Sequence, residues 1–260
     1  MFLEKIARTK QKEVAELVRK ITPEDWERAC ALPRGLSLKD AITSGETVSI
    51  IAEVKQASPS KGVIASGIDP VKVARGYEDG GAAAVSVLTD MIYFHGNADF
   101  LVNVKQAVNL PVLRKDFIID DRQIVESKLM GADAILLIAA LLNREQLQQL
   151  TRIAHRLGLE VLVEIHGKEE IPLALACEAD VIGINNRNLH TFETDIANTE
   201  QLRPLLPEDQ PVVGESGVLS LADARRLQQA GVQGILVGEY LMRQKDPMQA
   251  VRRLREGLTR

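Results

Sequence analysis

The feature that most constrains the fold is a regular alternation of short apolar runs and amphipathic stretches, which starts near residue 48 and continues almost to the end of the chain. The runs are rich in Val, Ile and Leu, and the stretches between them place apolar residues at helical spacing. Several stretches end in Gly directly before the next run, as helices often do. Continuous apolar strands that alternate with helices predict a parallel sheet covered by helices.

The number of strand–helix units favours a closed barrel over an open sheet. Eight units follow one another without a linker, and 260 residues is close to the roughly 250 of one (β/α)8 barrel. An open dinucleotide-binding sheet would carry a Gly-x-Gly-x-x-Gly fingerprint after its first strand, and this sequence has none there. We therefore expect an α/β protein with a (β/α)8, or TIM, barrel whose strands cover residues 48–54, 83–88, 111–117, 133–138, 159–165, 180–185, 211–216 and 234–238.

An extra segment precedes the first strand. The first twenty residues have helical periodicity, and shorter helices are expected at 24–30 and 37–44. Because this segment comes before any strand, we expect it to pack outside the barrel. We treat 1–260 as one domain, with an N-terminal helical extension over 1–46 and the barrel over 47–260.

Charge and hydropathy limit the partners. The 32 Lys and Arg against 36 Asp and Glu give a net charge of -4, which is not typical of a nucleic-acid binder. The longest apolar run, over 134–142, is far shorter than the roughly 20 residues of a membrane helix. The charged N-terminus lacks a signal-peptide core. We expect a cytoplasmic protein without nucleic-acid or membrane partners, as a monomer or weak homo-oligomer.

Polar and charged residues stand at the ends of five expected strands, in register with inward-facing positions. Side chains alternate along a strand, and the carboxyl ends of barrel strands build the active site. A strand interior of Val, Ile and Leu has no structural need for such residues, so five strands that end alike predict a site where pKa values shift. Its members are Glu53, Lys55, Lys115, Glu164, Asn185, Arg187 and Glu215.

Two glycine turns predict a phosphate site. Gly217 follows the seventh expected strand, and Gly238 follows the eighth. Barrels often bind phosphate on these two loops, where glycine lets backbone N–H groups approach the anion. The ligand is therefore expected to be a small phosphorylated molecule.

The polar loop 55–62 follows the first strand. Ser58, Ser60 and Lys61 are placed to cover a substrate, and the loop is expected to act as a lid. The histidines, among them His166 after the fifth strand, show no metal-ligand spacing with Asp or Glu, and we assign them no role. We expect acid–base chemistry without a metal or a cofactor.

At these residues the sequence resembles the indole-3-glycerol phosphate synthase family. The segments that carry the resemblance occur in family order and cover the expected barrel. They are IIAEVKQASPSKG (50–62), SVLTD…YFHGNADFL (86–101), PVLRKDFIID (111–120), GADAILLI (131–138), LVEIH (162–166), IGINNRNLHTF (182–192), GESGV (214–218) and VGEYLM (237–242).

The resemblance implies a carboxy-lyase of tryptophan biosynthesis. Its substrate is 1-(2-carboxyphenylamino)-1-deoxyribulose 5-phosphate, and its products are indole-3-glycerol phosphate, CO2 and water. Lys115 matches the general acid of ring closure, and Glu164 matches the acid–base carboxylate of the dehydration. Lys55 is an alternative acid in that step. Glu53 and Glu215 are expected to tune the lysines, and Asn185 to contact the sugar or the intermediate.

The resemblance also implies the residues that bind the substrate. The substrate-binding set is Ser58, Phe94, Phe117, Arg187 and Phe192, and the phosphate-binding set is Lys55, Ser216, Gly217, Gly238 and Glu239. For Phe192, plain core packing is an equal alternative. Two departures from the family pattern are Asp121–Arg122, where Pro-Tyr is expected, and Glu239, which can serve phosphate only through its backbone N–H.

Two other functions remain open from the sequence. One is another phosphate-binding barrel enzyme, such as a sugar-phosphate isomerase, which would need a different acid–base pair. The other is a barrel that binds ligand without catalysis, and such a protein would normally have lost Lys55, Lys115 or Glu164.

Overall fold

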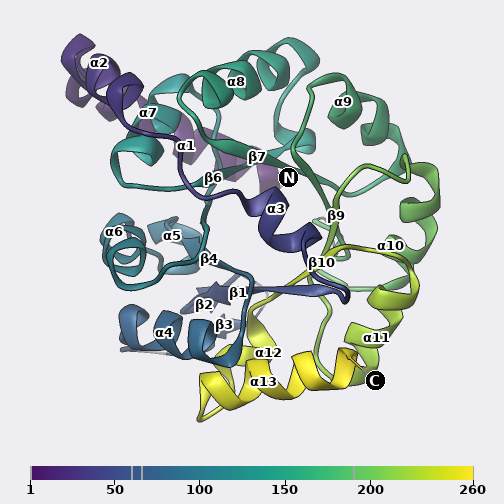
Figure 1. Cartoon of the computed structure of the whole chain (residues 1–260). Helices are drawn as coiled ribbons and strands as arrows, with labels where there is room; N and C mark the ends of the chain where they lie inside the picture. The colour runs from purple at the N-terminus through teal and green to yellow at the C-terminus, as the bar shows by residue number, and fades with distance from the viewer. Residues whose placement is uncertain (1, 60, 66, 190, 260) are drawn as a thin grey trace.

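A computed structural model describes residues 2–59, 61–65, 67–189 and 191–259. Its central element is a closed barrel in which β1 pairs in parallel with both β4 and β10, so that the sheet has no free edge. Figure 1 shows the helices arranged around this ring. The prediction of a (β/α)8 barrel is confirmed, and its strands are β1 (Ser49–Val54), β4 (Ala84–Leu88), β5 (Val112–Lys115), β6 (Ala134–Ile138), β7 (Glu160–Ile165), β8 (Val181–Asn185), β9 (Val212–Glu215) and β10 (Gly234–Val237).

The helices that cover the barrel begin at local signals in the sequence. An Asp, Asn or Ser side chain accepts a backbone N–H of the first turn in most of them, which satisfies a donor that the helix leaves open. None of the helices in the described ranges is long and apolar enough to cross a membrane. The covering helices are α4 (Pro70–Gly80), α6 (Ala98–Ala107), α7 (Asp121–Leu129), α8 (Arg144–Arg156), α9 (Ile171–Ala176), α10 (Ala197–Leu202), α11 (Leu221–Gln229) and α13 (Pro247–Leu258), with the short α5 (Met91–Phe94) and α12 (Glu239–Met242) at strand ends.

The alternation of side chains divides the apolar core into two parts. Ile51, Leu113 and Leu162 belong to a cluster inside the barrel. Ile50 and Val163, on the opposite face of their strands, belong to the larger cluster between the barrel and its helices. This is the parity expected from the sequence, and it directs the polar residues near the strand ends into the barrel mouth.

The N-terminal segment forms the three expected helices, α1 (Phe2–Lys20), α2 (Pro23–Ala31) and α3 (Leu38–Thr43). The expectation that the segment packs outside the barrel is wrong. Leu38 and Ile42 of α3 are fully buried in the inner cluster, because the end of the barrel where the strands begin needs an apolar cover. The carboxylate of Glu160, at the start of β7, accepts hydrogen bonds from Ser37 Oγ at 2.6 Å and Lys39 N at 2.8 Å, and holds α3 there.

Helix α1 lies at the opposite end of the barrel. Figure 1 looks onto the face that α3 crosses, and α1 is seen faded behind the strands. The side chains of Leu3 and Ile6 reach the cavity at the carboxyl ends of the strands. One N-terminal segment therefore covers both ends of the barrel.

A buried ionic cluster attaches α1 to the barrel. Lys10 is 1% exposed, and its Nζ lies 2.7 Å from Asp90 Oδ2, after β4, and 2.8 Å from Asp116 Oδ1, after β5. Burial alone would raise the pKa of Asp116, but the Arg114 and Lys10 cations outweigh it and lower that pKa to about 2. Asp116 directly follows Lys115, so the cluster fixes the backbone that carries a predicted catalytic residue.

The loop after β1 is more ordered than the sequence suggested. β2 (Ala57–Ser58) and β3 (Gly62–Val63) pair in an antiparallel hairpin inside it. Two-residue strands give too short a pattern to be recognised by alternation. Ser60, expected to cover the substrate, lies outside the described residues.

We predict that Lys10→Met lowers the free energy of unfolding by about 3–5 kcal/mol, because it leaves the buried Asp90 without its cation and leaves Asp116 with Arg114 alone. Denaturant titration at pH 7 measures the change. Lys20→Met is the matched control, since Lys20 and its partner Glu16 are 69% and 74% exposed and 3.9 Å apart. Equal stability of the two variants would contradict the assignment.

The cluster of Lys10, Asp90 and Asp116 also predicts how the stability of the protein changes at low pH. Because the pKa of Asp116 is depressed from 3.8 to about 2, its contribution to stability is present above pH 3.8 and is lost as the pH falls toward 2. We expect the acid unfolding of Lys10→Met to depend less steeply on pH in this window than that of the wild type. Parallel acid titrations followed by circular dichroism compare the two.

Candidate active site

A cavity of about 420 Å³ lies at the carboxyl ends of the barrel strands. It gathers side chains from β1, β5, β7, β8 and β9 together with the loops that follow β4, β9 and β10. Fourteen of the fifteen residues predicted for the site line it: Glu53, Lys55, Phe94, Lys115, Phe117, Glu164, Asn185, Arg187, Phe192, Glu215, Ser216, Gly217, Gly238 and Glu239.

Ser58 is the exception among the predicted residues. It does not line the cavity, and its side chain is buried at 4% exposure. Within the part of the chain that the structure describes, its hydroxyl has no hydrogen-bond partner. Its neighbours in the loop, Pro59 and Lys61, do line the cavity. Residues between the two strands of the hairpin thus cover the site.

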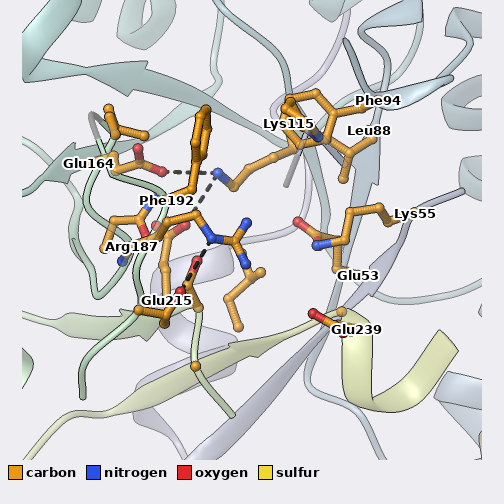
Figure 2. A pocket seen from close by; sticks show the side chains of 18 of the residues that line it. Glu53, Lys55, Leu88, Phe94, Lys115, Glu164, Arg187, Phe192, Glu215 and Glu239 are labelled. Atoms are coloured by element: carbon orange, nitrogen blue, oxygen red, sulfur yellow. Dashed lines mark hydrogen bonds and ion pairs between the residues drawn. The ribbon is translucent and has the colours of Figure 1, made fainter. Parts of the chain in front are cut away.

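Lys115 is the centre of the charged network. Its Nζ lies 3.0 Å from Oε2 of Glu164 and 3.2 Å from Oε2 of Glu215. Figure 2 shows Lys115 extending from β5 toward these two carboxylates across the barrel. A second ion pair joins Lys55 to Glu53 on β1. The two lysines therefore approach the cavity from different strands, each with its own carboxylate partner.

Burial and charge shift the pKa values of this network in different directions. Burial would lower the pKa of Lys115, but Glu164 and Glu215 raise it well above its ordinary value. Burial would raise the pKa of Glu164, but Lys115 and His166 hold it well below its usual range. Burial, with the nearby Glu164 carboxylate, raises the pKa of Glu215 to about 7 although Lys115 opposes the shift. At neutral pH the site therefore holds a charged lysine, a charged Glu164 and a Glu215 near its midpoint.

Such a network can move protons in a space that excludes most water. The Lys115 ammonium is a charged donor that can stabilise a developing alkoxide. The ionised Glu164 is a base that can accept a proton from carbon or nitrogen.

The end of β8 presents polar groups beside this network. Asn185 is 9% exposed, and its Oδ1 accepts a hydrogen bond from the backbone N–H of Arg187 at 3.0 Å. The Arg187 Nε lies 3.3 Å from the Thr194 hydroxyl, across an isolated β-bridge between these two residues. The turn thereby fixes the guanidinium at the rim of the cavity, where Figure 2 shows it.

One wall of the cavity is apolar. The rings of Phe94 and Phe117 pack at a centroid distance of 6.0 Å, and Leu88, Leu136 and Ile138 continue the surface. Phe192 is half-buried and lines the cavity from the loop after β8, so it is not an ordinary core residue. This wall suits a flat aromatic group.

The loops after β9 and β10 form the predicted phosphate end. Ser216 and Gly217 both adopt left-handed backbone conformations, with φ of 63° and 92°, which turns the chain sharply after Glu215. A side chain at Gly238 would displace the Glu53 carboxylate and the Lys55 amine, so glycine at this position preserves their placement in the cavity. The Glu239 carboxylate is paired with Arg243 at 2.9 Å, which offsets its negative charge at this end.

Sequence reasoning missed three residues at the site. Leu3 and Ile6 belong to α1, and no local pattern indicates which part of a barrel a preceding helix will cover. His166 received no role, yet its Nε2 lies 3.3 Å from Oε1 of Glu164. Its position two residues after Glu164 on the same strand face was the available signal. Among the described residues, no three His, Cys, Asp or Glu side chains are grouped as metal ligands.

Known proteins resemble the chain at two levels. Solved structures at low sequence identity share its fold: the thiamine phosphate pyrophosphorylase of Pyrococcus furiosus has a TM-score of 0.62 at 17% identity, covering 86% of this chain and 98% of that one. The N-acetylmannosamine-6-phosphate 2-epimerase of Clostridium perfringens also has a TM-score of 0.62, at 14% identity, covering 87% and 98%. At these identities the likeness shows the barrel alone.

Similarity in sequence is much stronger. The indole-3-glycerol phosphate synthase of Halalkalibacterium halodurans is 47% identical over 255 residues, covering 97% of this chain and 96% of the relative. The enzyme of the same name from Geobacillus thermodenitrificans is 48% identical over 254 residues, with coverage of 97% and 96%. The sequence profile described as indole-3-glycerol phosphate synthase matches residues 3–254. With these matches and the cavity described above, the chain belongs to the indole-3-glycerol phosphate synthase family.

Proposed function

We propose that the cavity converts 1-(2-carboxyphenylamino)-1-deoxyribulose 5-phosphate into indole-3-glycerol phosphate, CO2 and water. The observation that carries this proposal is the position of Lys115, a buried cation held between Glu164 and Glu215 beside an apolar wall. Ring closure needs a cation at a developing alkoxide and a surface for an aromatic ring. Family membership supports the same reaction.

The substrate is oriented by the two ends of the cavity. Its phosphate lies at Ser216, Gly217, Gly238 and the backbone of Glu239, with Lys55 as the nearest cation on β1. Its carboxyphenyl ring packs against Phe94, Phe117 and Phe192. This places the ketone of the sugar chain near the centre of the barrel, within reach of Lys115.

Lys115 is the general acid of ring closure in this proposal. The aromatic carbon that carries the carboxylate attacks the ketone carbon, and the ketone oxygen takes the proton of the Lys115 ammonium. The raised pKa keeps Lys115 charged until the oxygen becomes basic. Loss of CO2 then restores the aromatic ring.

Glu164 acts in the dehydration that follows. The hydroxyl formed by ring closure leaves as water, and a proton is removed from the neighbouring carbon. The depressed pKa keeps Glu164 ionised in the resting network, so its carboxylate is available to take the proton from this carbon. Lys55 is then the acid for the leaving hydroxyl, with Glu53 holding its ammonium in place.

The remaining polar residues position these groups. Glu215 sets the place and charge of Lys115, Asn185 contacts the sugar hydroxyls, and Arg187 closes the rim of the cavity. We further propose that Ser58 reaches the substrate when the hairpin rearranges around it, because its buried hydroxyl has no hydrogen-bond partner in the described residues.

The proposal also covers the domain organisation, the location and the oligomeric state of the protein. The whole chain acts as one domain, because α1 and α3 of the extension each contribute to the barrel and its cavity. We propose that it works in the cytoplasm as a monomer or weak homo-oligomer, without nucleic-acid partners. Size-exclusion chromatography with light scattering tests the oligomeric state.

Lys115→Ala is predicted to reduce kcat by about 10²–10⁴-fold, the usual contribution of a general acid, while the protein still binds the substrate. Indole fluorescence of the product measures turnover, and calorimetry with a reduced, unreactive substrate analogue measures binding. Lys72→Ala, an exposed position on α4, is the matched control. A wild-type chain without indole product would refute the function, and an unchanged kcat in Lys115→Ala would refute the mechanism alone.

Glu215→Gln is predicted to stabilise the protein increasingly as the pH rises from 4.5 to about 8. The folded protein holds the Glu215 proton up to a pKa of about 7, against 4.5 for an ordinary Glu, so the wild type loses stability as the pH rises through this window. The difference corresponds to about 3 kcal/mol at pH 8, and Gln keeps the neutral form at every pH. Thermal unfolding of both proteins at several pH values measures it, and a gap that shrinks with rising pH would contradict the assignment.

A further inference from the structure

His166 follows β7 and lies between two carboxylates. Its Nε2 is 3.3 Å from Oε1 of Glu164, and its Nδ1 is 3.8 Å from Oε2 of Glu170, in the turn that precedes α9. We propose that His166 is a proton relay that delivers one proton per turnover from a second cavity to Glu164 and, through it, to Lys115. This inference rests on the proposed reaction.

A second cavity of about 380 Å³ adjoins the substrate cavity, and the two share lining residues at the end of β8, among them Asn185 and Arg187. His166 and Glu170 line the second cavity but not the substrate cavity, whereas Glu164 lines only the substrate cavity. His166 therefore lies between a carboxylate of one cavity and a carboxylate of the other. The walls of the second cavity are polar and apolar in nearly equal parts, and Asn186, Asn198 and Gln201 supply polar side chains that can bind water.

The proton balance of the reaction requires a supply from outside. The ketone oxygen leaves as water and takes up two protons, while one proton is removed from carbon. The carboxylate leaves as neutral CO2. Each turnover therefore consumes one proton that neither the substrate nor the resting site replaces. A bound substrate fills the first cavity, so the second cavity is the available source.

The steps balance as follows. Lys115 gives its proton to the alkoxide, and the amine left behind is a stronger base than imidazole. His166 Nε2 passes a proton to the ionised Glu164, and Glu164 passes it to this amine across their 3.0 Å contact, which leaves Glu164 ionised for the dehydration. Glu164 then takes the carbon proton while Lys55 gives its proton to the leaving hydroxyl. When the product leaves, Glu164 releases that proton into the emptied cavity and Lys55 regains one there. His166 regains a proton at its buried Nδ1 from Glu170, whose Oε2 lies 3.8 Å away and which takes the proton from the second cavity that it lines. No bond other than O–H and N–H bonds is made or broken in the relay.

The surroundings keep His166 protonated, which is the form that the relay needs. Burial would lower its pKa, but Glu164 and Glu170 raise it to about 9, so it is a cation at neutral pH. Arg187, Glu193 and Asp195 also line the second cavity and face the same space. The Asn198 amide donates to the His166 carbonyl at 3.2 Å, and the His166 backbone N–H donates to Glu170 at 2.6 Å. These two bonds fix the backbone of His166 beside Glu170.

The test compares His166→Gln with the matched control His155→Gln. His155, on α8, pairs with Asp180 at 2.8 Å and lines neither cavity, so its kcat should equal that of the wild type. We expect His166→Gln to lower kcat on the order of 10²-fold with little change in KM, because Gln keeps the size of the group but cannot pass a proton. In His166→Gly, added imidazole should restore kcat as its concentration rises, because it can occupy the space that the missing side chain leaves beside Glu164.

Glu170→Gln keeps the test decisive if His166→Gln does not fold. We expect the wild-type kcat to fall as the pH rises through about 9, where His166 loses its proton. In Glu170→Gln this fall should move to lower pH, because one of the two carboxylates that raise the His166 pKa is gone. A folded His166→Gln with wild-type kcat, a loss in His166→Gly that imidazole does not restore, or an unmoved profile in Glu170→Gln would overturn the relay. With an active wild type, none of these results would touch the proposed reaction.

Discussion

The structure depends on one buried ion pair network, in which Lys115 is held between Glu164 and Glu215. Burying charge is costly, and a buried cation is tolerated only when fixed carboxylates surround it. The closed barrel provides that condition, because β5, β7 and β9 direct inward side chains toward one axis. The inner apolar cluster below the network and the aromatic wall beside it exclude water and so strengthen each of these interactions.

Much of the fold and of the site could be predicted from the sequence, for a physical reason. Strand parity links the identity of a core residue to the direction of the polar residue that follows it. Leu113 and Lys115 share a face, as do Leu162 and Glu164, and the structure places all four inside the barrel. Because a barrel repeats this rule in eight strands, the same pattern can be recognised several times along the chain.

What the sequence did not indicate depends on contacts between distant segments. Lys10 in a charged helix looks like a surface residue, and only the pairing with Asp90 and Asp116 makes it a buried one. The hairpin after β1 has strands too short to carry a pattern. The role proposed for His166 depends on a cavity that Glu170 lines together with residues after β8. The residues after β8 lie far from His166 in the sequence.

The N-terminal segment that covers both ends of the barrel also affects how the chain folds during synthesis. Lys10 needs Asp116, and Ser37 needs Glu160, so α1 and α3 have no binding surface at these positions until about a hundred or more further residues have been made. Until then the apolar faces of α1 and α3 are exposed, a state in which chains associate or recruit chaperones. The part of the molecule that is made first is therefore among the last to dock, and closure of the substrate cavity waits for it.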